Sequence, residues 1–111
     1  METYPEKTCS IERLVTHPKL VAAAKAGLKT QQRRDGVYAW PGETFALEDI
    51  TFIVTRLERQ RLGDLTDEHA RAEGYPALES YRSMILRMHP GMTWNPDSLV
   101  WVHTFEARKD T

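Results

Sequence analysis

The chain has 111 residues, 41% of them hydrophobic and 28% charged, which indicates one domain with a modest core. Its formal net charge of −1 excludes a global positive field that would attract nucleic acid. Its single cysteine, Cys9, excludes an intrachain disulfide and suits a reducing compartment. No segment approaches the roughly 18 consecutive apolar residues of a membrane span, and the first ten residues lack the apolar run of a signal peptide. We therefore expect a cytoplasmic protein without a membrane partner.

One helix is predicted in the first third of the chain. Apolar residues recur at helical spacing from Ile11 to Ala26, but Pro18 interrupts the run. Because proline suits a first helical turn, the pattern favours a helix that begins at about Pro18. Gly27 stands where a left-handed C-terminal cap is expected.

The middle of the chain carries strand patterns. Lys29–Arg34 is polar and fits an extended strand, whose alternate side chains face opposite sides. Asp35-Gly36 and residues 40–43 are turn signals. Thr44–Leu47 and Ile50–Leu57 are rich in β-branched and aromatic residues, which predicts two further strands.

Two helices and a closing strand are predicted next. Thr66 can cap a short helix that Gly74 ends, and Pro76–Met88 forms the second helix. Leu99–Phe105 alternates as a strand. The order of elements lacks regular βαβ alternation, so we expect an α+β fold, a small mixed β-barrel packed by helices. Residues 1–10 are expected to form a leader and residues 11–108 a single domain.

The segment Gly27–Arg34 is the strongest functional candidate, with three cations and two amides in its eight residues. On a strand, Thr30, Gln32 and Arg34 share one face, while Lys29, Gln31 and Arg33 share the other. A lysine beside arginines has its pKa lowered when it is also desolvated, and it can then act as a general base. The alternative is a solvated basic strand.

Other candidate groups lie further along the chain. Glu73 is at the C-terminal end of a predicted helix, where the dipole disfavours a carboxylate, so a cation such as Lys29 or Arg34 is needed to compensate it. The loop aromatics Tyr38, Trp40 and Trp94 suit base stacking or a small-molecule pocket, and capping of an open barrel end is the alternative. No histidine pair has metal spacing and no cofactor-binding fingerprint is present, so we expect no metal and no cofactor.

Three stretches, taken in order, resemble the ASCH domain, a PUA-like family. They are Gly27-Leu28-Lys29-Thr30 with Arg34 and Pro41-Gly42-Glu43, then Leu65–Gly74, then His89-Pro90-Gly91 with the closing strand. The resemblance covers roughly residues 14–107 and implies a small PUA-like barrel flanked by helices.

Within this family, the chain is most similar in length and in its Lys and Glu positions to small bacterial N4-acetylcytidine amidohydrolases. That group's catalytic set is a Lys, a Thr and a Glu. Lys29 and Glu73 match two of them, but the third position holds Gln32, which cannot accept an acyl group as a hydroxyl can. Thr30 could replace that hydroxyl, or Lys29 and Glu73 could activate water directly, or the activity could be lost.

The resemblance implies an amidohydrolase that cleaves an N4-acylated cytosine nucleoside or base into its amine and a carboxylic acid. Lys29 would be the base, Glu73 would carry a proton to the leaving nitrogen, and Thr30 would be the nucleophile or would orient water. The substrate-binding residues would be Gln32 and Arg34 for the oxyanion and pyrimidine edge, with Tyr38 and Trp94 stacking on the ring. We expect Lys29→Ala to abolish activity but to preserve the fold, because the lysine should line a cavity.

The alternative is an RNA-binding module or a nuclease for single-stranded RNA. It would use Lys25, Lys29, Arg33 and Arg34 on phosphates, with Trp40 and Tyr38 stacking on bases. The net charge of −1 counts against it. A third option is an adaptor whose partner is another protein.

Overall fold

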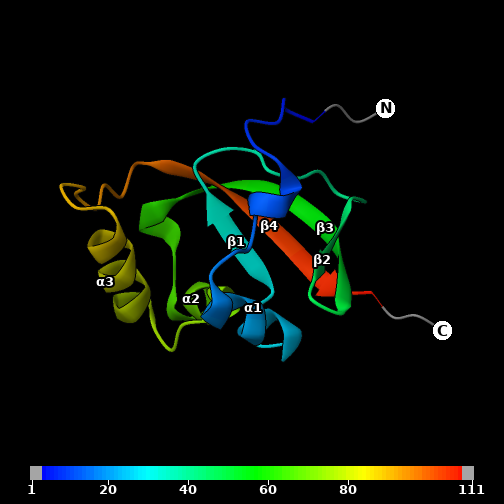
Figure 1. Ribbon diagram of the computed structural model, residues 1–111. Helices are drawn as coiled ribbons and strands as arrows, with labels where there is room; N and C mark the ends of the chain where they lie inside the picture. Colours follow the sequence, from blue (N-terminus) through cyan, green and yellow to red (C-terminus); the bar gives the residue numbers. More distant parts are fainter. Residues whose placement is uncertain (1–3, 109–111) are drawn as a thin grey trace.

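The computed structural model describes residues 4–108. Within this range four strands form one curled antiparallel sheet, half of a barrel, and three α-helices pack along it (Figure 1). The expected α+β class is confirmed. No helix of the described range is long and apolar enough to cross a bilayer. In chain order the elements are η1 (Ile11–Arg13), α1 (Pro18–Lys25), β1 (Gln31–Arg34), β2 (Thr44–Leu47), β3 (Ile50–Arg61), η2 (Leu62–Asp64), α2 (Asp67–Glu73), α3 (Leu78–Met88) and β4 (Leu99–Ala107).

The strand order in the sheet is β1-β4-β3-β2, so β1 is an edge strand beside the last strand of the chain. Figure 1 shows α3 standing beyond this edge, with α1 and α2 at its lower end. Within the described range no further strand covers this edge, so side chains from both faces of β1 can border the space beside it. The candidate site lies in that space.

Strand β1 is anchored to two neighbours. The preceding helix α1 begins at Pro18, as predicted, and the chain turns through Gly27, whose φ of 79° lies in the left-handed region that favours glycine. The Thr30 N–H then donates to the Ala72 carbonyl of α2 at 2.8 Å, and the Thr30 carbonyl accepts from the Phe105 N–H of β4 at 2.9 Å. These bonds fix the segment before β1 between a helix and the sheet.

Helix α2 positions the acidic residue of the site. Thr66 and His69 form a reciprocal capping box at its start, and Gly74 ends it at a φ of 103°, so both predicted boundaries are confirmed. The helix packs against β1 and α3. Glu73 is therefore its last residue and faces the edge of the sheet.

The two faces of the sheet carry two hydrophobic cores. On one face, the Phe105 ring lies 5.4 Å from the ring of Phe45 and 5.7 Å from that of Phe52. Val100 is an odd number of residues from Phe105 along β4, so its side chain points to the opposite face of the sheet. There it packs against the cluster that contains Tyr81. The second core joins α2 and α3 to the sheet.

The strands extend beyond their predicted ends. The second and third predicted strands start where expected, but β3 continues from Leu57 to Arg61, and β4 continues from Phe105 to Ala107. The extra length of β3 pairs with β4 after a register shift between Val54 and Arg56. Its mixed charges gave no strand pattern because this part of β3 is largely exposed.

The described part of the expected leader contacts the loop of residues 37–43. The indole Nε1 of Trp40 donates to the Pro5 carbonyl at 2.9 Å. The ammonium group of Lys7 lies 4.7 Å from the centre of the Trp40 ring and pairs with Glu43 at 2.5 Å. Trp40 is therefore packed by the N-terminal segment.

Candidate functional site

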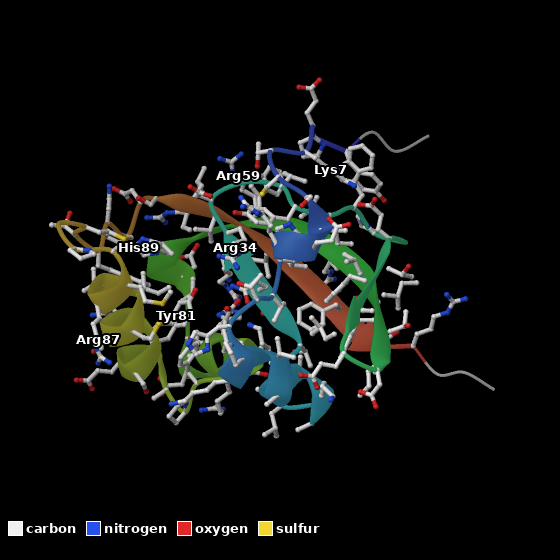
Figure 2. All side chains as sticks on the ribbon, viewed as in Figure 1. Lys7, Arg34, Arg59, Tyr81, Arg87 and His89 are labelled. Atoms are coloured by element: carbon white, nitrogen blue, oxygen red, sulfur yellow. The ribbon has the colours of Figure 1, made fainter. Side chains whose placement is uncertain are left out.

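A cavity of about 1110 Å³ lies between the edge strand β1 and helix α3. Residues of β1 and α2 line it, namely Gln32, Arg33, Arg34 and Glu73. Tyr81 of α3, the start of α1 and the loop before β4 contribute further lining residues. Among the lining residues, Figure 2 labels Arg34 on β1 and Tyr81 on α3.

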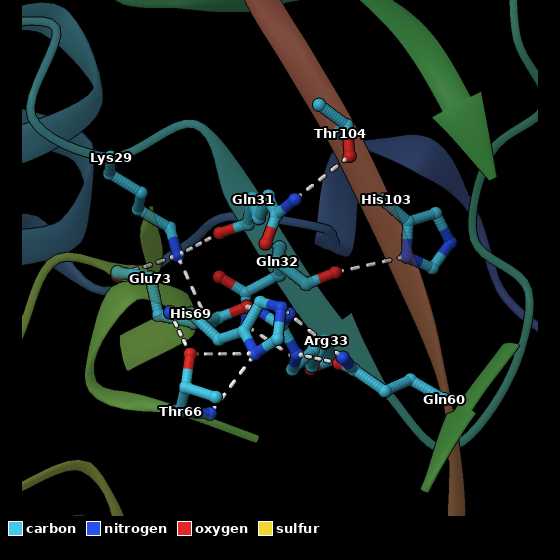
Figure 3. A network of polar contacts seen from close by, with 10 residues as sticks. All are labelled: Lys29, Gln31, Gln32, Arg33, Gln60, Thr66, His69, Glu73, His103 and Thr104. Atoms are coloured by element: carbon cyan, nitrogen blue, oxygen red, sulfur yellow. Dashed lines mark hydrogen bonds and ion pairs between the residues drawn. The ribbon is translucent and has the colours of Figure 1, made fainter. Parts of the chain in front are cut away.

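Glu73 carries a buried carboxylate on the wall of this cavity, although the residue is only 1% exposed. One carboxylate oxygen lies 3.4 Å from Lys29 Nζ, and the other lies 3.0 Å from Arg33 Nη1 (Figure 3). The structure thus brings Lys29 and Glu73 together and adds a second cation that was not expected there. Two opposing cations compensate a carboxylate that the helix C-terminus disfavours.

Lys29 lies behind Glu73 and is not on the cavity wall, contrary to expectation. Its side chain is fully buried, and its ammonium group also donates to the carbonyls of Gln31 at 2.6 Å and Glu73 at 2.9 Å. All three of its donors are therefore used. Burial lowers the pKa of Lys29, and the charge and hydrogen bond of Glu73 oppose that shift.

Arg33 extends the polar network away from the cavity. It is 6% exposed, and its Nε donates to Gln60 Oε1 at 2.8 Å while its Nη1 holds Glu73. The Gln60 amide in turn lies 3.5 Å from the His69 ring, which accepts the Thr66 N–H at the start of α2. Sequence reasoning placed Arg33 on the same strand face as Lys29 but assigned it to phosphates, because nothing local marked it as a partner of Glu73.

Gln32 and Arg34 present unused hydrogen-bonding atoms beside the cavity. Gln32 is only 7% exposed, and its Oε1 has no hydrogen-bond partner among the described residues. Arg34 donates from Nη2 to the carbonyls of Leu14 at 2.8 Å and Arg13 at 3.2 Å, which leaves its buried Nε without a partner. An open acceptor and an open donor thus lie two residues apart on β1.

Thr30 is placed apart from these groups. Its side chain is exposed and does not line the cavity, whereas its backbone forms hydrogen bonds with α2 and β4. Thr30 precedes β1, so the strand alternation that was expected to put its side chain beside Gln32 does not apply to it.

Two of the three candidate aromatics reach the cavity. Tyr38 lines it, with the Arg34 guanidinium 5.2 Å from its ring centre. Trp94 lines it as well, edge-to-face with Tyr81 at 6.5 Å. Trp40 does not line it. Burial and the neighbouring charge of Glu73 raise the pKa of Tyr81, so its hydroxyl stays protonated.

His103 supports the loop that carries Tyr38. Its Nε2 accepts the Tyr38 N–H at 3.0 Å, so in the neutral ring the proton is on Nδ1, which donates to the Gln32 carbonyl at 3.2 Å. Burial lowers the pKa of His103 and keeps the ring neutral. His103 is thus a buried residue that hydrogen bonds at both of its ring nitrogens hold in the structure. No group of three or more potential metal ligands occurs in the part of the chain described.

No protein-family model matches the chain, and no curated protein matches it significantly. Among solved structures it is similar to a protein of Enterococcus faecalis from family DUF984, with a TM-score of 0.62, 16% identity, and coverage of 81% of this chain and 67% of that one. It is also similar to an ASCH domain of Lactobacillus crispatus, with a TM-score of 0.59, 14% identity, and coverage of 79% and 69%. The chain therefore has the fold of an ASCH domain, a PUA-like architecture, as the motifs implied.

Proposed function

We propose that the protein hydrolyses the amide of an N4-acylated cytosine nucleoside in the cavity beside β1. The observation that carries the proposal is Glu73, a carboxylate on the cavity wall that is fixed between Lys29 and Arg33. A fixed, nearly dry carboxylate facing a cavity is suited to proton transfer. The motif resemblance supplies the substrate and the reaction.

In the proposed reaction Glu73 accepts a proton from a water molecule as the water oxygen adds to the acyl carbonyl carbon. The unused Nε–H of Arg34 stabilises the oxyanion, and the Gln32 amide binds the base. Glu73 then gives the proton to N4 as the C–N bond breaks. The products are cytidine and the carboxylic acid, so one water is consumed for each amide cleaved.

This scheme gives Lys29 a positioning role. Its three donors are occupied and its side chain is buried behind Glu73, so it orients the carboxylate and does not touch the substrate. A covalent route through Thr30 is disfavoured because that side chain is exposed outside the cavity. Direct attack by water, one of the routes open from the sequence, is the one that we propose.

Turnover of acylcytidines tests the proposal. The purified protein is incubated with N4-acetylcytidine and longer acyl analogues, and cytidine release is followed by chromatography. Glu73→Gln should lower kcat by roughly 10² or more, since general base catalysis contributes that much. Glu68→Gln, an exposed glutamate on the same helix, is the matched control and should keep full activity.

Circular dichroism of both variants shows that each is folded before activity is compared. Two results would overturn the proposal: no cytidine from any acylcytidine with the folded wild-type protein, or equal rates for Glu73→Gln and wild type.

A further inference from the structure

A row of cationic and aromatic side chains crosses one face of the sheet next to the cavity. Arg34 of β1 pairs in register with Trp101 of β4, and Trp101 pairs with Arg59 of β3, so the three side chains share one face. The Arg59 guanidinium lies 4.8 Å from the centre of the Trp101 ring, and the Arg34 guanidinium lies 5.2 Å from that of Tyr38. We call Tyr38, Arg34, Trp101 and Arg59 the Arg–Trp strip.

The cations of the strip are not neutralised by carboxylates. Within residues 4–108 neither Arg34 nor Arg59 forms an ion pair, and Arg59 is exposed. By contrast, Arg56 on the opposite face of β3 pairs with Glu58, and Arg61 at the end of β3 pairs with Asp97. In a chain of net charge −1, the strip is thus a local site of unpaired positive charge.

The four cations expected to bind phosphates are mostly engaged elsewhere. Lys25 pairs with Glu48 and Asp49, while Lys29 and Arg33 are buried around Glu73. Only Arg34 of that set lies in the strip. Of these surfaces, the Arg–Trp strip is therefore the one with cations that are available to bind phosphates.

The strip is continuous with the cavity because Arg34 and Tyr38 belong to both. Neighbouring strands place paired residues about 5 Å apart, so Arg59 lies roughly 10 Å across the sheet from Arg34. Alternating guanidinium groups and aromatic faces match a single strand, whose charged phosphates alternate with bases that are free to stack. A duplex offers no such free base faces.

We propose that the Arg–Trp strip binds the strand that flanks a base held in the cavity, so that the substrate is a single-stranded oligonucleotide. The acylated cytosine leaves the stack and enters the cavity, while Trp101 stacks on a neighbouring base and Arg59 contacts a phosphate. The assignment of the base as an acylated cytosine rests on the proposed function. Binding of a single strand by the strip does not.

The experiment compares Arg59→Ala with Arg56→Ala, two exposed arginines of one strand that point to opposite faces. Dissociation constants for unmodified single-stranded RNA, single-stranded DNA and duplex oligonucleotides are measured by fluorescence anisotropy at several salt concentrations. Arg59→Ala should weaken single-strand binding at least about threefold and reduce the salt slope by about 0.7, the value for one phosphate contact on a single strand. Arg56→Ala should match the wild type.

A second readout uses kcat/KM for N4-acetylcytidine and for an oligonucleotide that contains it. The ratio of the oligonucleotide value to the nucleoside value should fall in Arg59→Ala and stay constant in Arg56→Ala. Equal effects of the two variants on binding, or duplex binding as tight as single-strand binding, would overturn the proposal that the Arg–Trp strip binds a single strand. If Arg59→Ala weakens single-strand binding while no acylcytidine is hydrolysed, that proposal is supported and the proposed function fails.

Discussion

Replacement of Lys29 by methionine should destabilise the protein strongly, although the sequence suggested that the fold would tolerate its loss. Methionine keeps much of the length of the side chain and removes its charge and its three hydrogen bonds, to Gln31 O at 2.6 Å, Glu73 O at 2.9 Å and Glu73 Oε1 at 3.4 Å. The variant leaves a buried carboxylate with one cation, and the carbonyls of Gln31 and Glu73 each lose a donor.

Breaking a buried ion pair by removing one partner costs about 3–5 kcal/mol. Because Arg33 still compensates Glu73 in Lys29→Met, we expect the low end, ~3 kcal/mol, a large share of the about 5–15 kcal/mol that stabilises a typical domain. Urea unfolding followed by tryptophan fluorescence measures it, and the midpoint should fall by roughly 1–3 M at an m-value of about 1–3 kcal/mol/M. Lys19→Met, an exposed lysine of α1, is the control and should stay within about 0.5 kcal/mol of wild type.

A double-mutant cycle separates the pair from its surroundings. The effect of Lys29→Met should shrink by about 1–3 kcal/mol when Glu73 is already glutamine, because the buried charge that needed the lysine is gone. A loss below about 1 kcal/mol in Lys29→Met, or strict additivity in the cycle, would refute the buried Lys29–Glu73 contact as a stabilising element.

Two further predictions concern Gln32 on the cavity wall and His103 beneath the loop that carries Tyr38. Gln32→Thr should retain or improve acylcytidine hydrolysis, measured as kcat/KM, because a threonine hydroxyl can also hydrogen-bond to the base and matches the residue at this position in the amidohydrolases that the motifs resemble. Inactivation would show that the Gln32 amide itself is required. His103 has a folded-state pKa below its unfolded value of 6.5, so the stability that His103 contributes should be fully present above about pH 6.5 and be lost as the pH drops through the folded pKa. Urea titrations of wild type and His103→Gln at pH 7.5 and pH 5 measure this contribution. An unfolding free energy that changes equally with pH in the two proteins would contradict the prediction.

Local sequence signals were sufficient for most of the fold. Pro18 and Gly27 mark the limits of α1, and Thr66 and Gly74 mark those of α2, because capping and left-handed turns depend on single residues. The exposed second half of β3 was not recognised, since its strand character comes from pairing with β4 and not from its own composition.

The site was predictable only in part. A carboxylate at a helix C-terminus needs a cation, and this rule anticipated the approach of Glu73 to Lys29. The rule did not identify Arg33, and it did not show that Lys29 would be enclosed behind the carboxylate. The row of Arg34, Trp101 and Arg59 depends on the pairing of three strands far apart in the chain, which no local pattern specifies.

The three tryptophans of the chain report on three places, so one spectrum can show where a ligand binds. Trp94 lines the cavity and Trp101 lies in the strip, whereas Trp40, whose indole donates to the Pro5 carbonyl, belongs to neither. The most direct measurement is a titration of ¹⁵N-labelled Glu73→Gln protein with N4-acetylcytidine, following the three indole N–H resonances. This variant should hydrolyse the nucleoside about 10²-fold or more slowly than the wild type. We predict that the Trp94 resonance shifts to saturation while that of Trp40 stays in place. A stationary Trp94 resonance at saturating nucleoside would contradict the cavity as the binding site.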